Sequence, residues 1–74
     1  MAEAVDFELR GEFITLAALL KASGMAGSGG EAKTLATRGD VLVNGTPENR
    51  RGRKLRAGDE IAVGGSRIRV RAGA

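Results

Sequence analysis

Five basic side chains crowd into seven residues in the second half of the chain, and they are its clearest candidates for chemistry. They are Arg50, Arg51, Arg53, Lys54 and Arg56, arranged around Gly52. A guanidinium group forms a planar fork of donors that matches two phosphate oxygens, and it also stacks on exposed bases. Cations this close repel one another unless water or anions surround them. Residues 50–56, the basic segment, therefore predict a site for a polyanion.

The distribution of charge favours the same partner. Residues 1–31 carry a net charge of −3 and residues 32–74 a net charge of +6, which gives the whole chain +3. Lys33 and Arg38 add two cations ahead of the basic segment. Such asymmetry suggests a polyanion as the partner of the second half of the chain. Charge alone also fits a solvated basic surface, an acidic protein partner or DNA.

The residues that catalysis usually needs are missing or dispersed. The chain has no cysteine and no histidine, which removes the commonest general base and the thiolate ligands of metals. Asp40, Asp59 and Glu60 fall at expected turns, and Glu31 is expected to cap a helix. We therefore expect no enzyme activity, no cofactor and no metal.

Length and hydropathy predict one small cytoplasmic domain. The 74 residues suffice for a single domain, residues 1–74, with a frayed tail at 72–74. No apolar run approaches the roughly 20 residues that span a membrane, and the acidic start lacks the features of a signal peptide. We expect a monomer without membrane association.

The elements that position the cations follow from the spacing of apolar residues. Apolar and charged residues alternate over residues 5–10, which predicts a half-buried strand. Thr15 caps a helix that Gly24 stops. Its core residues are Leu16, Leu19 and Leu20.

A second helix follows a glycine-rich joint, residues 24–30. Ser28 and Glu31 have the spacing of a capping box, and Gly39 stops the helix. Its narrow apolar stripe consists of Ala32, Leu35 and Ala36. Small alanines allow it to pack close to the first helix.

The second half of the chain is rich in strand signals. Val41 and Val43 predict a strand, and Asn44-Gly45 predicts a tight turn. Residues 48–60 are expected to be extended or irregular, with Leu55 as their one apolar anchor. A hairpin over residues 61–70 completes the sheet, with its arginines on the outer face.

Aromatic stacking is not expected. Phe7 and Phe13 are the only aromatic residues, and both are predicted to lie in the core. Nucleic acid is then held mainly through its phosphates and its shape.

The glycine-rich joint has two other interpretations. It lacks the Gly-Lys-Ser/Thr ending of a phosphate-binding loop and follows a helix rather than a strand. Residues 24–27 match the GXXG of KH domains, but the middle residues carry no charge. A plain turn is the simpler interpretation.

The order of these motifs resembles the S4 domain, a small RNA-binding fold named after a ribosomal protein. The matching residues, which span 15–61, are Leu16, Leu19, Leu20, Gly24, Ser28, Ala32, Lys33, Gly39, Val41, Val43, Asn44, Gly45, Gly58, Asp59, Glu60 and Ile61. The short chain and the run from Glu48 to Leu55 resemble small stand-alone bacterial S4-like proteins.

The resemblance implies an α+β domain in which two short helices pack on a small, mainly antiparallel sheet. It also implies that structured RNA, such as ribosomal RNA, lies against the second helix, the joint before it and the strand turn that follows. Carried over by position, this implicates Ser28, Lys33, Arg38 and Asn44 beside the basic segment. Many S4 domains have Ser-Arg where this chain has Ser28-Gly29, so one usual phosphate contact is absent.

Rival functions remain at this stage. A protein-interaction adaptor could use the basic segment to meet an acidic partner. A ubiquitin-like sulfur carrier fits the size, but such carriers need a terminal Gly-Gly and the sequence ends Gly73-Ala74.

Overall fold

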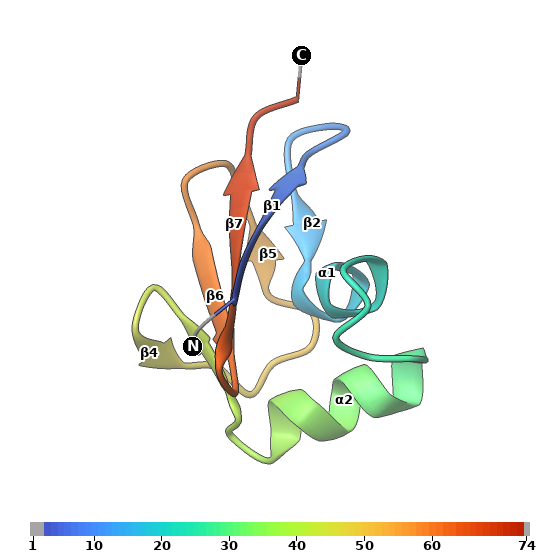
Figure 1. Ribbon diagram of the computed structural model, residues 1–74. Coiled ribbons are helices and arrows are strands. Elements are labelled where there is room, and N and C mark those ends of the chain that lie inside the picture. Colours follow the sequence, from blue (N-terminus) through green and yellow to red (C-terminus); the bar gives the residue numbers. More distant parts are fainter. Residues whose placement is uncertain (1–2, 74) are drawn as a thin grey trace.

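The chain folds into a five-stranded mixed sheet with two short helices packed against it, and the computed structural model describes residues 3–73 (Figure 1). The strand β1 (Glu3–Glu8) runs parallel to β7 (Ser66–Arg71). The sheet continues in antiparallel pairs through β6 (Glu60–Val63), β3 (Val41–Val43) and β4 (Thr46–Pro47). A second, two-stranded sheet pairs β2 (Ile14–Thr15) with β5 (Lys54–Leu55). The predicted α+β class is confirmed.

Both helices begin at the predicted caps. In α1 (Leu16–Ala22) the Thr15 hydroxyl accepts a hydrogen bond from the Ala18 amide at 3.3 Å. In α2 (Gly29–Thr37) the Ser28 hydroxyl accepts one from the Glu31 amide at 3.2 Å. These bonds satisfy amides that have no partner inside the helix. After α2 the chain turns at Gly39, whose φ of +78° suits a residue without a side chain.

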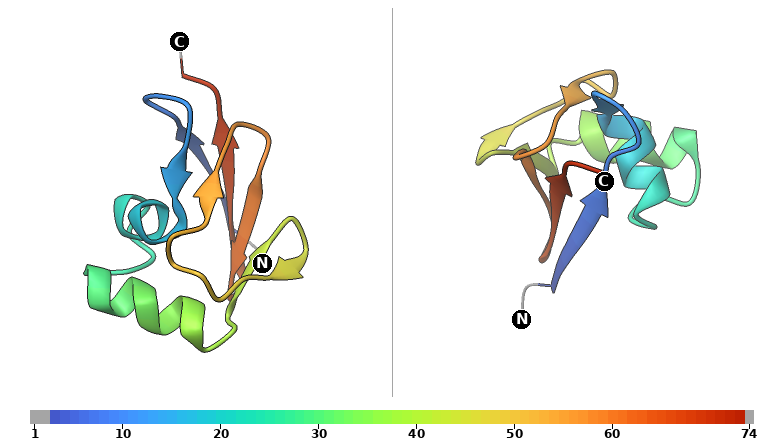
Figure 2. Two further views of the ribbon diagram at one scale, coloured as in Figure 1. Left: turned by 180° about the vertical axis from the view of Figure 1, so that it is seen from behind. Right: turned by 90° about the horizontal axis from the view of Figure 1, so that it is seen from above.

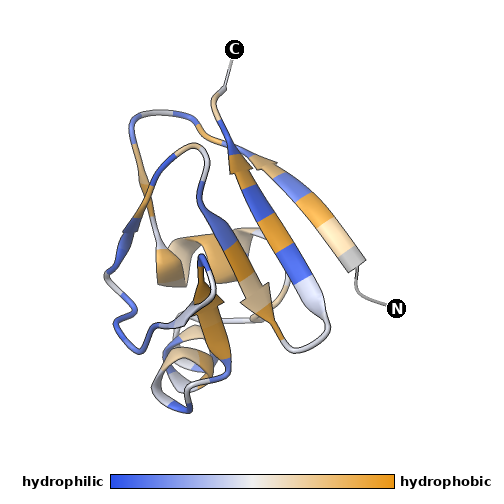
Figure 3. Cartoon of the chain, turned by 90° about the vertical axis from the view of Figure 1, so that its left-hand side faces the viewer, coloured by the Kyte–Doolittle hydropathy of each residue, from blue (hydrophilic) through white to orange (hydrophobic). Residues whose placement is uncertain are grey.

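The core lies between the sheet and the helices. Alternate residues of β3 and β7 turn inward, and the hydropathy bands along β1 and β7 follow the same alternation (Figure 3). The predicted leucines of α1 are fully buried. The buried apolar residues are Leu9, Leu16, Leu19, Leu20, Ala26, Ala32, Ala36, Val41, Val43, Leu55, Ile61, Ile68 and Val70.

Phe13 departs from the predicted core. Phe7 packs against the core, but Phe13 is 43% exposed, so its assignment to the interior is wrong. Ile14, the next residue, packs against the core from β2 instead. Phe13 directly precedes this strand, and the alternation of side chains continued by one residue places it on the side opposite to Ile14.

The stretch predicted to be extended or irregular contains a short strand. Lys54 and Leu55 form β5, and Leu55 is fully buried, as expected of its apolar anchor. At the C-terminal end, Ala74 lies outside the described residues, so a frayed tail stays a prediction. No helix within residues 3–73 has the length and apolar character that crossing a bilayer requires.

Candidate nucleic-acid interface

The basic segment is fixed to the start of α1 by its own backbone. The Leu16 amide donates to the Arg53 carbonyl at 2.8 Å, and the Ala17 amide donates to the Arg51 carbonyl at 2.9 Å. Amides in the first turn of a helix have no acceptor within it, so the segment supplies the missing partners. In Figures 1 and 2 the stretch that links β4 to β5 accordingly runs close to the helices. The arginine side chains take no part in this attachment.

The pairing of β2 with β5 sets which side chains point outward. Ile14 lies opposite Leu55, and Thr15 lies opposite Lys54. Ile14 and Leu55 pack into the core. The alternation of side chains along a strand therefore turns Lys54 to the outer face of this two-stranded sheet.

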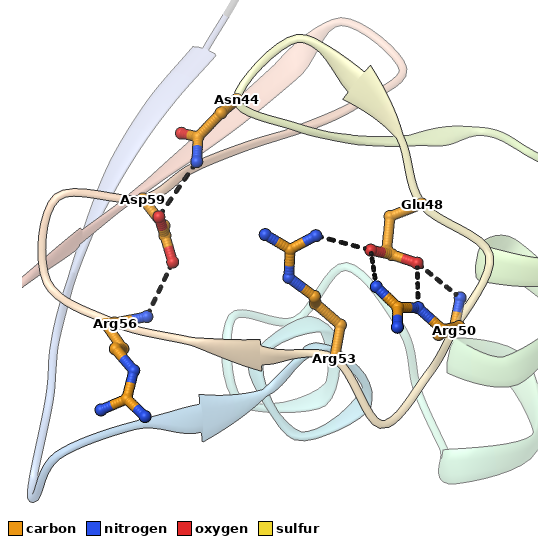
Figure 4. A network of polar contacts seen from close by, with 6 residues as sticks. All are labelled: Asn44, Glu48, Arg50, Arg53, Arg56 and Asp59. Carbon is orange, nitrogen blue, oxygen red and sulfur yellow. Dashed lines mark hydrogen bonds and ion pairs between the residues drawn. The ribbon is translucent and has the colours of Figure 1, made fainter.

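Glu48 joins two arginines of the basic segment (Figure 4). One carboxylate oxygen accepts from Arg53 Nη1 at 2.7 Å, and the other accepts from Arg50 Nε at 3.0 Å. The same second oxygen accepts from the Arg50 backbone amide at 3.1 Å. The Glu48 side chain is only 8% exposed. This carboxylate is the anion that the dense cluster requires.

The titration of Glu48 reflects these bonds. Hydrogen bonds from the side chains of Arg50 and then Arg53 lower the pKa of Glu48 to about 2 against the opposing effect of desolvation. The bond to Glu48 in turn raises the pKa of Arg50. Glu48 thus stays ionised at neutral pH and holds the two guanidinium groups in place.

Asn44 belongs to a second polar network, at the other end of the basic segment (Figure 4). Its side-chain amide donates to Asp59 at 3.0 Å, and its carbonyl oxygen accepts from the Glu60 amide at 2.9 Å. Asp59 also accepts from the backbone amide of Arg56 at 2.8 Å. Asn44 therefore secures the turn between β3 and β4 to the chain that carries Arg56.

Three cations of the basic segment have no acidic partner within 4.0 Å among the described residues. They are Arg51, Lys54 and Arg56. All three are exposed, and a hollow beside them is lined by Arg50, Gly52, Arg53 and Lys54. Since Glu48 balances only part of the charge, this surface stays strongly positive.

The outer face of the sheet offers a contrast. Arg67 and Arg69 both lie near Glu60, at 3.5 and 3.8 Å, and Arg71 lies 3.1 Å from Asp6. These arginines are exposed like those of the basic segment, but acidic residues flank them on both neighbouring strands. Their charge is largely compensated within the fold, so the basic segment is the stronger attractor for an anion.

The α2 candidates are less concentrated. Lys33 and Arg38 are exposed but lie roughly 140° apart around the helix axis, given five residues at 3.6 per turn. Arg38 also pairs with Asp40 at 3.4 Å. Ser28 caps the helix, and Gly29-Gly30 form its first turn rather than part of the joint. A single surface containing both Lys33 and Arg38 together with the basic segment stays a prediction.

The sequence patterns do not reveal the roles of two residues of this surface, Glu48 and Phe13. The sequence patterns give Glu48 no role, although it stands two residues before Arg50, next to the arginine run that it could neutralise in part. Phe13 was assigned to the core, yet Lys54 Nζ lies 4.9 Å from the centre of its exposed ring. The signal for Phe13 was its place between a glycine turn and the helix cap, where one side chain must face outward.

Comparison with known proteins agrees with this fold. A family model described as S4 domain matches residues 7–71, a longer span than the 15–61 expected from the motifs. A similar protein is "Probable ribosome maturation protein RlbA" from Bacillus subtilis (strain 168). It is 48% identical over 54 residues, which cover 73% of this chain and 76% of that protein. This chain belongs to the S4 domain family.

Proposed function

We propose that this protein binds structured RNA through the basic segment without catalysing a reaction on it. S4 domains are typically RNA-binding modules, which supports the class of partner. The basic segment supports the location, because it is the part of the described surface where exposed cations most outnumber acids.

One observation carries the proposal. Backbone carbonyls of Arg51 and Arg53 hold the segment on α1, so the attachment does not consume its side chains. The guanidinium of Arg51 is therefore available to an external anion. The backbone that carries it is already held on α1, so it does not have to become ordered when the anion binds. Preorganisation of this kind lowers the entropic cost of gripping a phosphate backbone.

Ribosomal RNA is the partner we propose within this class. The similar Bacillus subtilis protein is named as a probable ribosome maturation protein. A role on ribosomal RNA or on assembling subunits also implies a cytoplasmic location. The contacts we propose for the basic segment are chiefly to phosphates, so recognition would rest on the folded shape of the RNA rather than on base sequence.

The salt dependence of binding tests the proposal. The probes are purified 16S and 23S ribosomal RNA and a fluorescent RNA stem-loop. We expect affinity to fall steeply between low and moderate salt, because binding releases counterions from the phosphates. The double variant R51A/R56A removes two unpaired cations, so it is expected to bind more weakly and to lower the logarithmic salt slope by about 2.

Matched controls make the test specific. R67A/R69A removes the same charge from the outer face of the sheet and is expected to retain nearly all of the affinity. Arg53 is left intact because its loss would disturb Glu48. Equal binding by wild type and R51A/R56A would exclude the basic segment, and tighter binding to double-stranded DNA at matched salt would contradict the choice of RNA.

A further inference from the structure

Phe13 is the large apolar side chain that the described residues leave exposed, at 43%. A lone exposed apolar residue is ordinary on a protein surface. This one is unusual in its neighbours, because it directly precedes the strand that pairs with the basic segment. Its position, rather than its exposure alone, gives it a candidate role.

The register of β2 and β5 places Phe13 among cations. Ile14 faces Leu55 across the pair, so extending the register by one residue puts Phe13 opposite Arg56. Phe13 and Lys54 lie on the outer face, diagonal to one another, because Ile14 and Leu55 are turned into the core. Lys54 Nζ lies over the Phe13 ring, 4.9 Å from its centre, so the ammonium must move aside towards the neighbouring phosphate when a base stacks there.

Such a site joins two kinds of contact that an unpaired nucleotide offers. A base stacks on an aromatic face, and the adjoining phosphates attract ammonium and guanidinium groups. A base inside a duplex is stacked on its neighbours and is not available to Phe13. The combination of ring and cations therefore fits an unpaired nucleotide better than a continuous helix.

We propose that Phe13 is a stacking platform for one unpaired base, with Lys54 and Arg56 holding the phosphates beside it. The inference rests on the proposed RNA-binding function and makes it more specific. The substrate class becomes RNA with a bulged or looped nucleotide next to paired regions. A role confined to packing under Lys54 is the alternative that the experiment must separate.

Two substitutions and two probes make the test. The probes are an RNA duplex with a single bulged uridine and the same duplex without the bulge. F13L keeps an apolar side chain but removes the ring, so we expect about tenfold weaker binding to the bulged RNA and unchanged binding to the paired duplex. Its salt slope should equal that of wild type, because no phosphate contact is lost.

A fluorescent variant reports stacking directly. The chain has no tryptophan and no tyrosine, so F13W introduces a single strong fluorophore. We expect it to bind the bulged RNA as wild type does and its fluorescence to be quenched by that RNA alone. K21W, at an exposed position of α1, is the control and should show no quenching.

The outcomes separate the two proposals. Equal binding of both probes by F13L and wild type, with F13W unquenched, overturns the stacking role. If R51A/R56A still weakens binding in that case, the proposed function survives. An equal loss of affinity for both probes in F13L also overturns the stacking role, because it indicates a role in packing. Absence of binding by the wild-type protein removes both proposals.

Discussion

A single buried carboxylate decides how closely the arginines of the basic segment can lie. Glu48 accepts hydrogen bonds from Arg50 and Arg53 and is the buried charged residue among those described. Without it, the solvent-accessible guanidinium groups of Arg50 and Arg53 would repel one another at short range, with only water to screen them. The local fold therefore supplies an anion of its own before any phosphate arrives.

Replacing Glu48 by Gln should make this visible in the pH dependence of stability. The carboxyl group has a folded pKa of about 2 against an ordinary value of 4.5. A depressed pKa stabilises the folded state fully above the ordinary value, and this stabilisation is lost as the pH falls towards about 2. We expect E48Q to be less stable than wild type at pH 7, with the difference closing between pH 4.5 and 2. Urea midpoints across that range measure it, and a difference independent of pH would contradict the assignment.

Asn44 combines an unusual backbone with two side-chain bonds. Its φ of +52° is in the left-handed region, and its side chain contacts Asp59 and Glu60. N44A loses the side-chain hydrogen bonds and also the tolerance of asparagine for the left-handed region, so it should lower the free energy of unfolding by about 2–3 kcal/mol. N44G loses only the hydrogen bonds, and its loss should be roughly 1–2 kcal/mol smaller. Urea denaturation followed by circular dichroism compares them. Equal losses would mean that the backbone conformation carries no strain in the alanine variant.

At the scale of elements, β5 and α1 complete each other. The helix gains acceptors for its first amides, and the basic segment gains a rigid support. Leu55 anchors the basic segment to the core, because its side chain is fully buried. The stability of the proposed RNA contact surface therefore depends on a residue to which the proposal gives no contact with RNA.

Truncating Leu55 should loosen the segment. L55A removes a fully buried side chain and is expected to cost about 2–5 kcal/mol, while L55M conserves volume and should cost less than about 1.5 kcal/mol. Chemical denaturation gives both values. Faster amide hydrogen exchange at Leu16 and Ala17 in L55A would locate the damage at the start of α1. Unchanged exchange there would argue against the coupling of the two elements.

Local elements could be predicted and distant pairings could not. The caps at Thr15 and Ser28 involve residues three apart, so their spacing is visible in the sequence. The pairing of Ile14 with Leu55 joins positions 41 residues apart, and two-residue strands have no periodicity to detect. Because the pairing of Ile14 with Leu55 is not visible in the sequence, Phe13 is wrongly expected to lie in the core. The basic candidates were found by type, whereas the counter-ion role of Glu48 depends on a fold around it.

For the whole molecule, bound RNA should add to the stability of a small domain. A ligand that binds only the folded state at 100 times its dissociation constant contributes about 2.7 kcal/mol. For a domain of this size we expect the melting temperature to rise by on the order of 10 °C. Thermal scans with and without the RNA stem-loop measure this. The shift should shrink at high salt, and an unchanged melting temperature under saturating RNA would contradict specific binding to the folded state.

The parallel pairing of β1 with β7 has a consequence for synthesis. Residues 3–8 find their partner only in residues 66–71, close to the other end of the described chain. During translation β1, half of whose side chains are apolar, stays unpaired until Arg71 has left the ribosome. An unpaired strand can associate with other chains. Asp6 and Glu8, which alternate with the apolar residues of β1, are charges of the kind that oppose such association, so we expect their replacement by apolar residues to favour misassembly.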